Sequence, residues 1–433
     1  MQSAHHRRVA VVADDITGAN DIGLMFAKNG LNTAVIPFDT HTSAADFAGL
    51  DVAVLNTDSR FDTPAAAAGK VRRATELLQS SAFDLYFNKT CSVFRGNIGA
   101  ELDAMQSALG ERCSMVVLGF PKLGRTTVGG VHYLNGTRLD QSPFVNDPIH
   151  PATEADLRRI LARQSSRTSA VFTAEMLDLP ETARRAALAG LRESAAYVIF
   201  DVRDQQDLRA IAALIADARN ICGSSAIGEE LPKAWGVSAA AEQPLPPEFA
   251  RDGRGTLILA GSLTEATQRQ IAFLKRQGVP WTRLNPDALL DGGEDREAAR
   301  VVEAAAAAVS EGRDYLVHTA NDPQAVAASK SRAKQRGLDA AALGRLISRA
   351  VGKVAFHALS QTGARRAVAA GGDTSMAVSE ALGIRRMAIL HEIEPGVPAM
   401  LGTGRDGRYA LVFKSGSFGS DAFLRKAADA VNV

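Results

Sequence analysis

The stretch Ala367-Val-Ala-Ala-Gly371-Gly372-Asp373-Thr374-Ser375, near the C-terminal end of the chain, decides the fold class. Its apolar residues predict a short buried strand, and the glycine pair predicts a turn into a helix that Asp373 or Thr374 caps. Gly383 is placed to end that helix. Two glycines before a helix N-terminus let backbone N–H groups approach an anion closely. The stretch therefore predicts a phosphate site, with an ordinary strand-to-helix turn as the alternative.

Length and composition describe a globular protein of two domains. The chain has 433 residues, of which 46% are hydrophobic and 22% charged, and its formal net charge is +1. A charge this close to zero creates no field that would attract nucleic acid or a membrane surface. The cysteines are far apart and form no C-x-x-C pair, which fits a reducing cytosol. No apolar run approaches the roughly 20 residues of a membrane span, so we expect a soluble cytoplasmic protein with no nucleic-acid or membrane partner.

Four apolar segments in the first part of the chain predict strands of a parallel sheet, because strands covered on both faces are apolar throughout. A polar cluster follows each segment, and helical patterns alternate with the strands as far as about Trp235. This rhythm predicts an α/β domain. The four segments are Val9–Ala13, Val52–Leu55, Leu85–Phe87 and Met115–Leu118.

The polar residues that follow these strands predict a ligand site, since open parallel sheets bind ligands beyond the carboxyl ends of their strands. Mixed carboxylates and cations suit a small, polar, anionic substrate; separate solvated loops are the alternative. His132, in the irregular segment 130–151, lacks metal-ligand spacing and is either a substrate contact or a loop residue. The candidates at the strand ends are Asp14, Asp15, Asp58, Arg60, Lys89, Arg95 and Arg125.

A proline-rich segment, residues 239–255, predicts a linker between two domains, residues 1–238 and 256–433. The strand-helix pattern restarts after it. Thr256–Ala260 predicts a strand, and the turn Gly261-Ser262 before the next helix is a second candidate anion site.

The signatures of several other enzyme classes are missing from the sequence. No P-loop, protein-kinase, H-E-x-x-H or G-x-S-x-G motif occurs. Gly402-Thr-Gly404-Arg-Asp-Gly407 matches the dinucleotide pattern G-x-G-x-x-G, but a strand-like run follows it instead of a helix. We therefore expect a turn between strands there and no nicotinamide site.

Over nearly its whole length the chain resembles the four-carbon acid sugar kinase family. The resemblance rests on Ala13-Asp14-Asp15-Ile-Thr-Gly-Ala19, Thr57-Asp58-Ser-Arg60, Arg95-Gly96-Asn97-Ile-Gly99, Gly261-Ser262 and Gly371-Gly372-Asp373-Thr374. It implies two α/β domains with mainly parallel sheets, an N-terminal one that binds the sugar acid and a C-terminal one that binds ATP with Mg²⁺. It also implies phosphoryl transfer to the terminal hydroxyl of a tetronate such as D-threonate or D-erythronate.

The resemblance implies roles for individual residues as well. It assigns Asp14, Arg60 and the segment Lys89 to Asn97, with Ser92, Arg95 and Gly96, to the acceptor site. Many members have an aspartate where this chain has Cys91. Members similar to the 3-oxo-tetronate kinases share Cys91-Ser92 but lack the Arg-Gly-Asn that follows here, so a 3-oxo-tetronate remains an alternative acceptor. The implied nucleotide contacts are Ser262, Gly371, Gly372, Asp373, Thr374 and Gly416.

Phosphoryl transfer depends on positioning and charge neutralisation, with a carboxylate that orients the attacking hydroxyl and takes its proton. We predict Asp14 or Asp15 as this base, ahead of Asp58. Successive residues in an extended chain point to opposite sides, so we expect unequal roles for the two aspartates. A non-catalytic sensor of a small anion is the alternative class of function. The sequence identifies no metal ligands, and it leaves the oligomeric state open, with a homodimer as one option.

Overall fold

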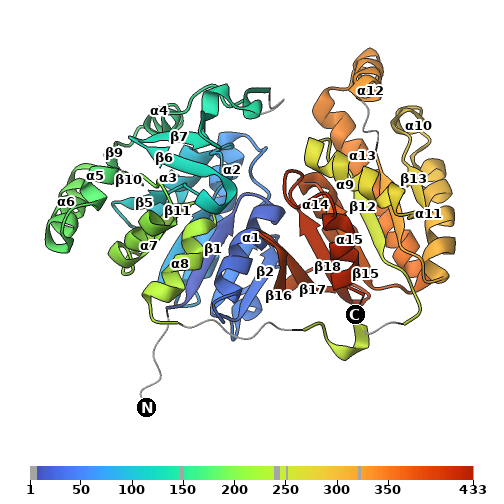
Figure 1. Ribbon diagram of the computed structural model, residues 1–433, viewed down its shortest axis with the longest axis horizontal. Helices are drawn as coiled ribbons and strands as arrows, with labels where there is room; N and C mark the ends of the chain where they lie inside the picture. The colour runs from blue at the N-terminus through green and yellow to red at the C-terminus, as the bar shows by residue number, and fades with distance from the viewer. Residues whose placement is uncertain (1–6, 147–150, 238–243, 250–251, 320–322, 433) are drawn as a thin grey trace. The chain divides into compact units, whose positions relative to one another are not determined.

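The computed structural model describes residues 7–146, 151–237, 244–249, 252–319 and 323–432. The chain forms two compact units, residues 1–241 and 242–433 (Figure 1). Each unit is a sheet with helices on both faces, which confirms the α/β prediction. Residues 239–243, 250 and 251 of the predicted linker lie outside the described residues. None of the described helices is long and apolar enough to cross a membrane.

The sheet of the first unit contains eight parallel strands in the order β2-β3-β1-β4-β11-β5-β10-β9. The chain runs from β1 through β2 to β3 on one side of β1 and then crosses to β4 on the other side. This reversal is the point at which open α/β sheets bind ligands. The strands are β1 Val9–Ala13, β2 Thr33–Pro37, β3 Val52–Asn56, β4 Leu85–Lys89, β5 Ser114–Val117, β9 Ser169–Phe172, β10 Tyr197–Phe200 and β11 Asn220–Gly223.

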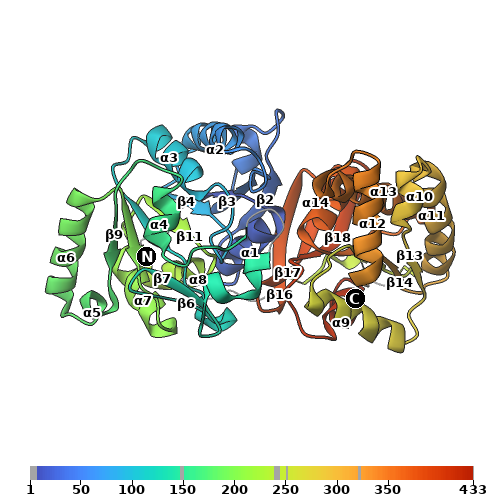
Figure 2. The same ribbon diagram turned by 90° about the horizontal axis from the view of Figure 1, so that it is seen from above.

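Helices cover both faces of this sheet because the strands are apolar on both sides. Ala10 and Val12 of β1 belong to a core with the helices α2 and α3, which lie together on one face (Figure 2). Side chains alternate along a strand, so Val9, Val11 and Ala13 face the other side. The helices are α1 Ile16–Ala27, α2 Pro64–Gln79, α3 Ile98–Leu109, α4 Leu157–Ala162, α5 Ala174–Leu177, α6 Glu181–Ser194, α7 Gln205–Leu214 and α8 Ala226–Ala234.

A small antiparallel sheet includes the first part of the segment 130–151, which the sequence shows as irregular. It consists of β6 Arg125–Val128, β7 Val131–Leu134 and β8 Thr137–Arg138. It joins the main part of the unit through Thr127, which exchanges backbone hydrogen bonds with Val202.

The sheet of the second unit has the order β13-β14-β12-β15-β18-β17-β16. The first five strands are parallel, and β17 pairs in antiparallel fashion with both β18 and β16. The predicted turn at the G-x-G-x-x-G pattern is confirmed, because β17 ends at Gly404 and β18 begins at Gly407. The strands are β12 Leu257–Ala260, β13 Trp281–Arg283, β14 Tyr315–His318, β15 Arg366–Ala370, β16 Arg386–Glu394, β17 Val397–Gly404 and β18 Gly407–Lys414.

Helices α9 and α15 pack on one face of this sheet, and α11, α13 and α14 pack on one another. The predicted cap of α14 is wrong: the residue before the helix is Gly371, which makes no side-chain cap, and Asp373 and Thr374 lie within the first turn. Gly383 follows the helix with a φ of 62°, as predicted. The helices are α9 Glu265–Arg276, α10 Pro286–Leu290, α11 Glu294–Ser310, α12 Pro323–Gln335, α13 Ala340–Thr362, α14 Gly372–Ala381 and α15 Phe423–Ala430.

The second half of the proline-rich segment packs on the second unit. Leu245 and Phe249 are buried in the core that contains β12, β15 and β18. Arg366, only 1% exposed, donates to the Phe249 carbonyl at 3.1 Å and pairs with Asp252 at 2.7 Å. The buried guanidinium therefore fixes this part of the chain to β15.

Candidate functional site

Three turns meet at the carboxyl ends of the adjacent strands β12, β15 and β18. They are Gly261-Ser262, Gly371-Gly372 and Ser415-Gly416, and we call them the three strand-end turns. Backbone hydrogen bonds join them: Gly261 and Ser262 donate to the Ala370 carbonyl at 3.1 and 3.2 Å, and Gly371 donates to the Lys414 carbonyl at 2.9 Å. The turns that the sequence predicts as separate anion sites are thus one structure.

The three strand-end turns approach so closely that side chains on their glycines would collide. A Cβ atom on Gly261 would lie 2.2 Å from Thr374 Oγ1, and one on Gly416 would lie 2.1 Å from Ser262 Oγ. Gly371 has a φ of 120°, which few other residues adopt. Glycine at these positions keeps the backbone of all three turns within reach of one ligand.

Helix α14 begins in the middle turn and adds its dipole to the site. Gly371 provides no side-chain cap, so the helix N-terminus keeps its capacity to bind an anion. The buried Ser375 hydroxyl, in the first turn, has no hydrogen-bond partner among the described residues. Asp373 is exposed and Thr374 is buried beside Gly261. All six predicted nucleotide residues therefore belong to these turns or to the start of α14.

In the first unit, Arg60 joins the two candidate catalytic aspartates. Its guanidinium donates to both carboxylate oxygens of Asp14, from Nε at 2.9 Å and from Nη2 at 2.7 Å, and from Nη1 to Asp15 Oδ2 at 2.6 Å. The Asp14 side chain is 1% exposed and that of Asp15 is 15% exposed. Paired in this way, Arg60, which follows β3, positions two carboxylates at the end of the neighbouring strand β1.

Asp15 also caps helix α1. Its Oδ1 accepts from the Gly18 N–H at 2.8 Å, and its Oδ2 accepts from the Thr17 hydroxyl at 2.9 Å. Burial would raise the pKa of Asp15, but Arg60, Lys89 and these hydrogen bonds hold it below its ordinary value. Asp15 is therefore an ionised carboxylate fixed at a helix start, whereas Asp14 is held in a bidentate ion pair.

Lys89, Arg125 and Asp21 form a second group of charges beside this pair. Lys89, the last residue of β4, and Arg125 both interact electrostatically with Asp21 of α1. Burial raises the pKa of Asp21 to about 6; Ser225 donates to its Oδ2, and its Oδ1 has no hydrogen-bond partner among the described residues. Arg125 is 8% exposed, and its Nε also lacks such a partner. Buried polar atoms without partners mark a place where a ligand or water is expected.

Arg95 lies at the edge of the same group. Its Nε donates to Cys91 Sγ at 3.4 Å, and its guanidinium stacks on the Phe144 ring at 5.2 Å from the centroid. Burial would raise the pKa of the Cys91 thiol, but Arg95 and Arg60 lower it. Arg95 and Gly96 also line a cavity of about 210 Å³.

Two other predicted acceptor residues, His132 and Asn97, have packing roles, and a third, Asp58, lies at the surface. His132 is fully buried, with Nε2 3.1 Å from the Ser92 carbonyl and Nδ1 3.0 Å from the Thr127 hydroxyl, and burial lowers its pKa to about 4. Asn97 donates from Nδ2 to the carbonyls of the loop after β3, at 3.1 and 2.9 Å. Asp58 is exposed at a φ of 47°. These positions support loop-building roles for His132 and Asn97 rather than direct contact with a substrate.

Comparison with known proteins agrees with this two-site geometry. Residues 9–231 match the model of a sugar-binding N-terminal domain, and residues 257–424 match that of a nucleotide-binding C-terminal domain. The 3-oxo-tetronate kinase of Pseudomonas fluorescens Pf-5 is 32% identical, over 96% of this chain and 95% of its own. The chain belongs to the four-carbon acid sugar kinase family.

Other members of the family match equally completely. The D-threonate kinase of Salmonella typhimurium LT2 is 28% identical over 96% of each chain. A crystal structure of a protein from Salmonella typhimurium LT2 has a TM-score of 0.81 and 28% identity, over 97% of this chain and 98% of that chain. The two-domain organisation of this sugar kinase family member is thus shared along its full length.

Sequence reasoning missed three residues of these sites. Asp21 and Ser225 face each other from α1 and α8, and only the fold brings them to Lys89. A weak signal existed for Ser225, because a Ser-Ser pair follows the buried strand β11. The third is Lys414, a cation at the end of an otherwise apolar strand, whose backbone holds the middle strand-end turn.

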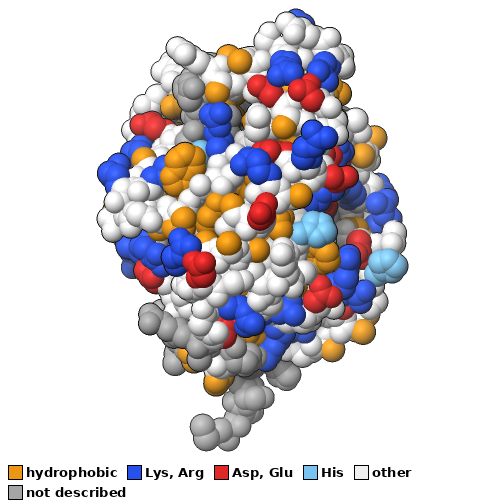
Figure 3. All heavy atoms as spheres, turned by 90° about the vertical axis from the view of Figure 1, so that its right-hand side faces the viewer, with side chains coloured by type: hydrophobic (Ala, Val, Ile, Leu, Met, Phe, Trp, Pro, Cys, Tyr) orange, Lys and Arg blue, Asp and Glu red, His pale blue; other side chains and the backbone are white. Residues whose placement is uncertain are grey.

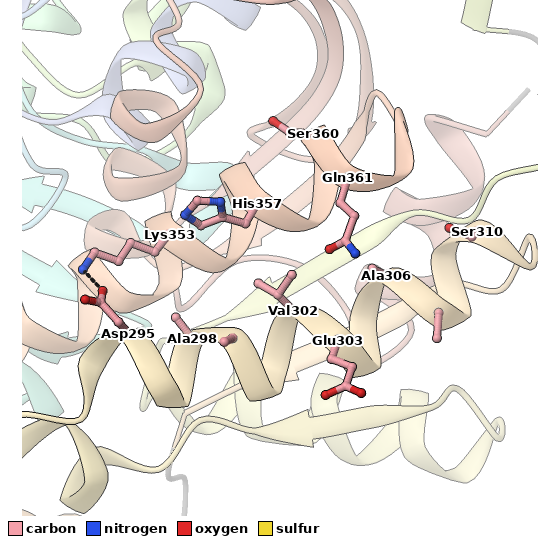
Figure 4. Close-up of a pocket in the computed structure, with 12 residues that line it drawn as sticks. Asp295, Ala298, Val302, Glu303, Ala306, Ser310, Lys353, His357, Ser360 and Gln361 are labelled. Atoms are coloured by element: carbon pink, nitrogen blue, oxygen red, sulfur yellow. Dashed lines mark hydrogen bonds and ion pairs between the residues drawn. The ribbon is translucent and has the colours of Figure 1, made fainter.

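A surface groove of the second unit has a different location. It lies between α11 and α13, has a volume of about 1060 Å³ and is lined by none of the predicted site residues. Figure 4 shows its rim, where Lys353 Nζ pairs with Asp295 Oδ1 at 2.7 Å. Figure 3 shows hydrophobic side chains gathered near the middle of the face seen from the right of Figure 1. Nothing in the groove's lining connects it with phosphoryl transfer.

We predict that Gly416→Ala weakens ADP binding by about tenfold or more, roughly 1.4 kcal/mol, because its methyl group would displace Ser262. Isothermal titration calorimetry measures the change. Gly344→Ala on α13 is the control, since a Cβ there meets nothing within 4 Å. Unchanged ADP affinity in Gly416→Ala would remove this turn from the nucleotide site.

Proposed function

We propose that this chain is an ATP-dependent kinase that phosphorylates the terminal hydroxyl of a four-carbon sugar acid, D-threonate or D-erythronate. The observation that carries the proposal is that the two units have sites of different chemical character. One unit has a cluster of buried cations and carboxylates, and the other has a cradle of backbone turns at a helix N-terminus. A sugar acid and a polyphosphate are the two ligands that such sites suit.

The charge of the first cluster favours an anionic acceptor. It contains four cations, Arg60, Lys89, Arg95 and Arg125, and three carboxylates, Asp14, Asp15 and Asp21. Because Arg60 is engaged by Asp14 and Asp15, we assign the substrate carboxylate to Lys89, Arg95 and Arg125. The Nε of Arg125, which has no hydrogen-bond partner among the described residues, supports this assignment.

We assign orientation of the attacking hydroxyl to Asp15. Its side chain is more exposed than that of Asp14, and it is ionised at a fixed position at the start of α1. The transition state of phosphoryl transfer is loose, so the orientation of the hydroxyl matters more than the strength of the base. Asp14 then acts on the reaction through Arg60, as a positioning residue.

ATP binding is assigned to Ser262, Gly371 to Thr374 and Gly416. Backbone N–H groups of the turns and the α14 N-terminus would hold the polyphosphate. The described residues include no group of three or more His, Cys, Asp and Glu side chains that could hold a metal. This fits Mg²⁺, which is commonly held by one or two carboxylates, phosphates and water, and Asp373 is the carboxylate nearest in sequence to the glycine pair. Mg²⁺ would neutralise charge on the phosphates.

A 3-oxo-tetronate is the second candidate acceptor. Cys91 favours it, because this thiol lies beside Arg95 and Arg60 at the place where many family members have an aspartate. Replacing a carboxylate by a thiol changes the hydrogen bonds that this position can offer to a hydroxyl or keto oxygen of the acceptor.

An acceptor screen tests the proposed function. Purified protein with ATP and Mg²⁺ is expected to release ADP with D-threonate or D-erythronate, and mass spectrometry should find one phosphate added to the acid. Turnover restricted to a 3-oxo-tetronate would select the second candidate. Thermal stabilisation by a tetronate without any ATP turnover would identify a sensor and overturn the kinase proposal.

We expect Arg125→Met to raise KM for the sugar acid at least about tenfold, since a charged hydrogen bond of roughly 1.5–3 kcal/mol is lost. The Kd for ADP should stay unchanged. Arg138→Met is the matched control, because Arg138 of β8 is 40% exposed and pairs with Asp140. An unchanged KM in Arg125→Met would place the carboxylate grip elsewhere.

We expect Asp15→Asn to lower kcat by about 10²- to 10⁴-fold, the usual contribution of a general base, with little change in KM for ATP. Asp14→Asn should chiefly lower stability, by about 3–5 kcal/mol, because it leaves Arg60 incompletely compensated. Steady-state kinetics and thermal melting separate the two effects. If both variants keep a normal kcat, the hydroxyl is oriented by another carboxylate, and Asp21 is the first to examine.

A further inference from the structure

Lys414 is a buried lysine directly beneath the three strand-end turns. It is the last residue of β18 and is 0% exposed. Its side chain lies on the same face of the sheet as that of Val412, toward α9, where Nζ donates to Thr267 Oγ1 at 2.9 Å and to the Gly416 carbonyl at 3.2 Å. The Thr267 hydroxyl donates to the same carbonyl at 2.8 Å. The amine is therefore one hydrogen bond away from the third turn.

The surroundings of this amine are neutral. Lys414 forms no ion pair with any described residue, and its hydrogen-bond acceptors are a hydroxyl and a carbonyl. Gln270 is the next inward-facing residue of α9. Its Nε2 donates to the carbonyls of Phe418, Gly419 and Ser420. The charged side chains of the surrounding segments include Glu265 and Arg269 of α9, Asp373 of α14, Glu394 of β16, Asp421 of the loop before α15 and Lys426 of α15.

Those charged groups are exposed or already paired. The Glu265 side chain is 89% exposed and pairs with Arg269, which also holds Asp421. Glu394 accepts from Ser420 and pairs with Lys426. Asp373 is exposed. A cation buried among neutral groups is costly unless an anion arrives to compensate it.

The position of Lys414 connects it with nucleotide binding. Its own carbonyl accepts from Gly371 N–H, and its amine holds the Gly416 carbonyl, so it contacts two of the three strand-end turns. A polyphosphate in these turns would bring several negative charges close to the amine. In a desolvated site such charges strongly favour the protonated form of a lysine.

We propose that Lys414 is the buried cation that compensates the nucleotide phosphates, and that nucleotide binding draws a proton from solvent onto its amine. This rests on the nucleotide site assigned under the proposed function. Burial lowers the pKa of free Lys414 to about 7. Bound phosphate raises the pKa of this amine. Nucleotide affinity is therefore highest below the pKa of the free enzyme, and it falls as pH rises from that value to the pKa of the complex.

Calorimetry of ADP binding tests the proposal without any acceptor. The titration is run at about pH 8, one unit above the free-enzyme pKa, where about nine-tenths of the amine is neutral. Buffers of different ionisation enthalpy then report the protons taken up. We expect uptake of more than about half a proton per ADP, and a Kd that rises several-fold, up to about tenfold per pH unit, between about pH 7 and 9.

Lys414→Met removes the amine and keeps a side chain of similar length. We expect it to abolish the proton uptake, flatten the pH dependence of Kd and weaken ADP binding at about pH 7 by roughly tenfold or more. The free variant should melt no lower than wild type, because an apolar side chain replaces a desolvated amine. Lys353→Met, on the exposed rim of the groove in Figure 4, is the control and should retain the uptake.

Several results would overturn the proposal. ADP binding by the wild-type enzyme without proton uptake would do so even if Lys414→Met failed to fold. Unaltered uptake in Lys414→Met would assign the proton to another group. A complete absence of ADP binding in wild type would instead contradict the nucleotide site itself, so the two failures are distinguishable.

Discussion

The burial of Arg60 against Asp14 and Asp15 is the constraint on which the first unit's site depends. A guanidinium this deep is tolerated only with full compensation, and the bidentate pair with Asp14 supplies most of it. The same contact joins the loops after β1 and β3, whose backbones are also linked by bonds from Ser59 and Arg60 to the Asp14 carbonyl. Gly96, at a φ of 109°, packs against Arg60 and brings in the loop after β4. Three strand ends are thus held together by one cation.

In the second unit, backbone groups hold the ends of the strands together. Its three strand-end turns are joined by backbone hydrogen bonds, and glycine provides the clearance that lets them converge. An acceptor that must be chosen by its carboxylate and hydroxyls needs specific side chains, whereas a polyphosphate common to many enzymes can be held by backbone dipoles. The division between the units follows this difference in ligand chemistry.

Local signals in the sequence predicted the elements well. Apolar runs predicted β1, β3, β4 and β12, and the structure forms a strand at each of them. The strand-end rule gathered Asp14, Asp15, Arg60, Lys89 and Arg125 correctly into one region. The partners within that region could not be predicted, because they depend on strand order. Arg60 looks like a free cation in the sequence, and only the adjacency of β1 and β3 gives it two carboxylates.

The burial of individual side chains could not be predicted from the sequence either. His132 lies in a polar, irregular segment, yet it belongs to strand β7 and is fully buried. The cap of α14 was misjudged because the helix already begins at Gly372, which places Asp373 and Thr374 within its first turn. Lys414 has no local feature that would distinguish it from a surface lysine at the end of a strand.

The order of the strands has a consequence for how the chain is made. β11 is the last strand of the first unit in sequence, but it lies between β4 and β5. Until residue 223 has left the ribosome, the sheet remains two unjoined parts with open edges, and unpaired strand edges invite association with other chains. Gly223 at the end of β11 allows the close approach to β5, because a Cβ there would lie 1.9 Å from the Val117 carbonyl oxygen. A nascent or truncated chain that stops short of this glycine would keep these edges open, although almost all of the residues that we assign to the acceptor are already present.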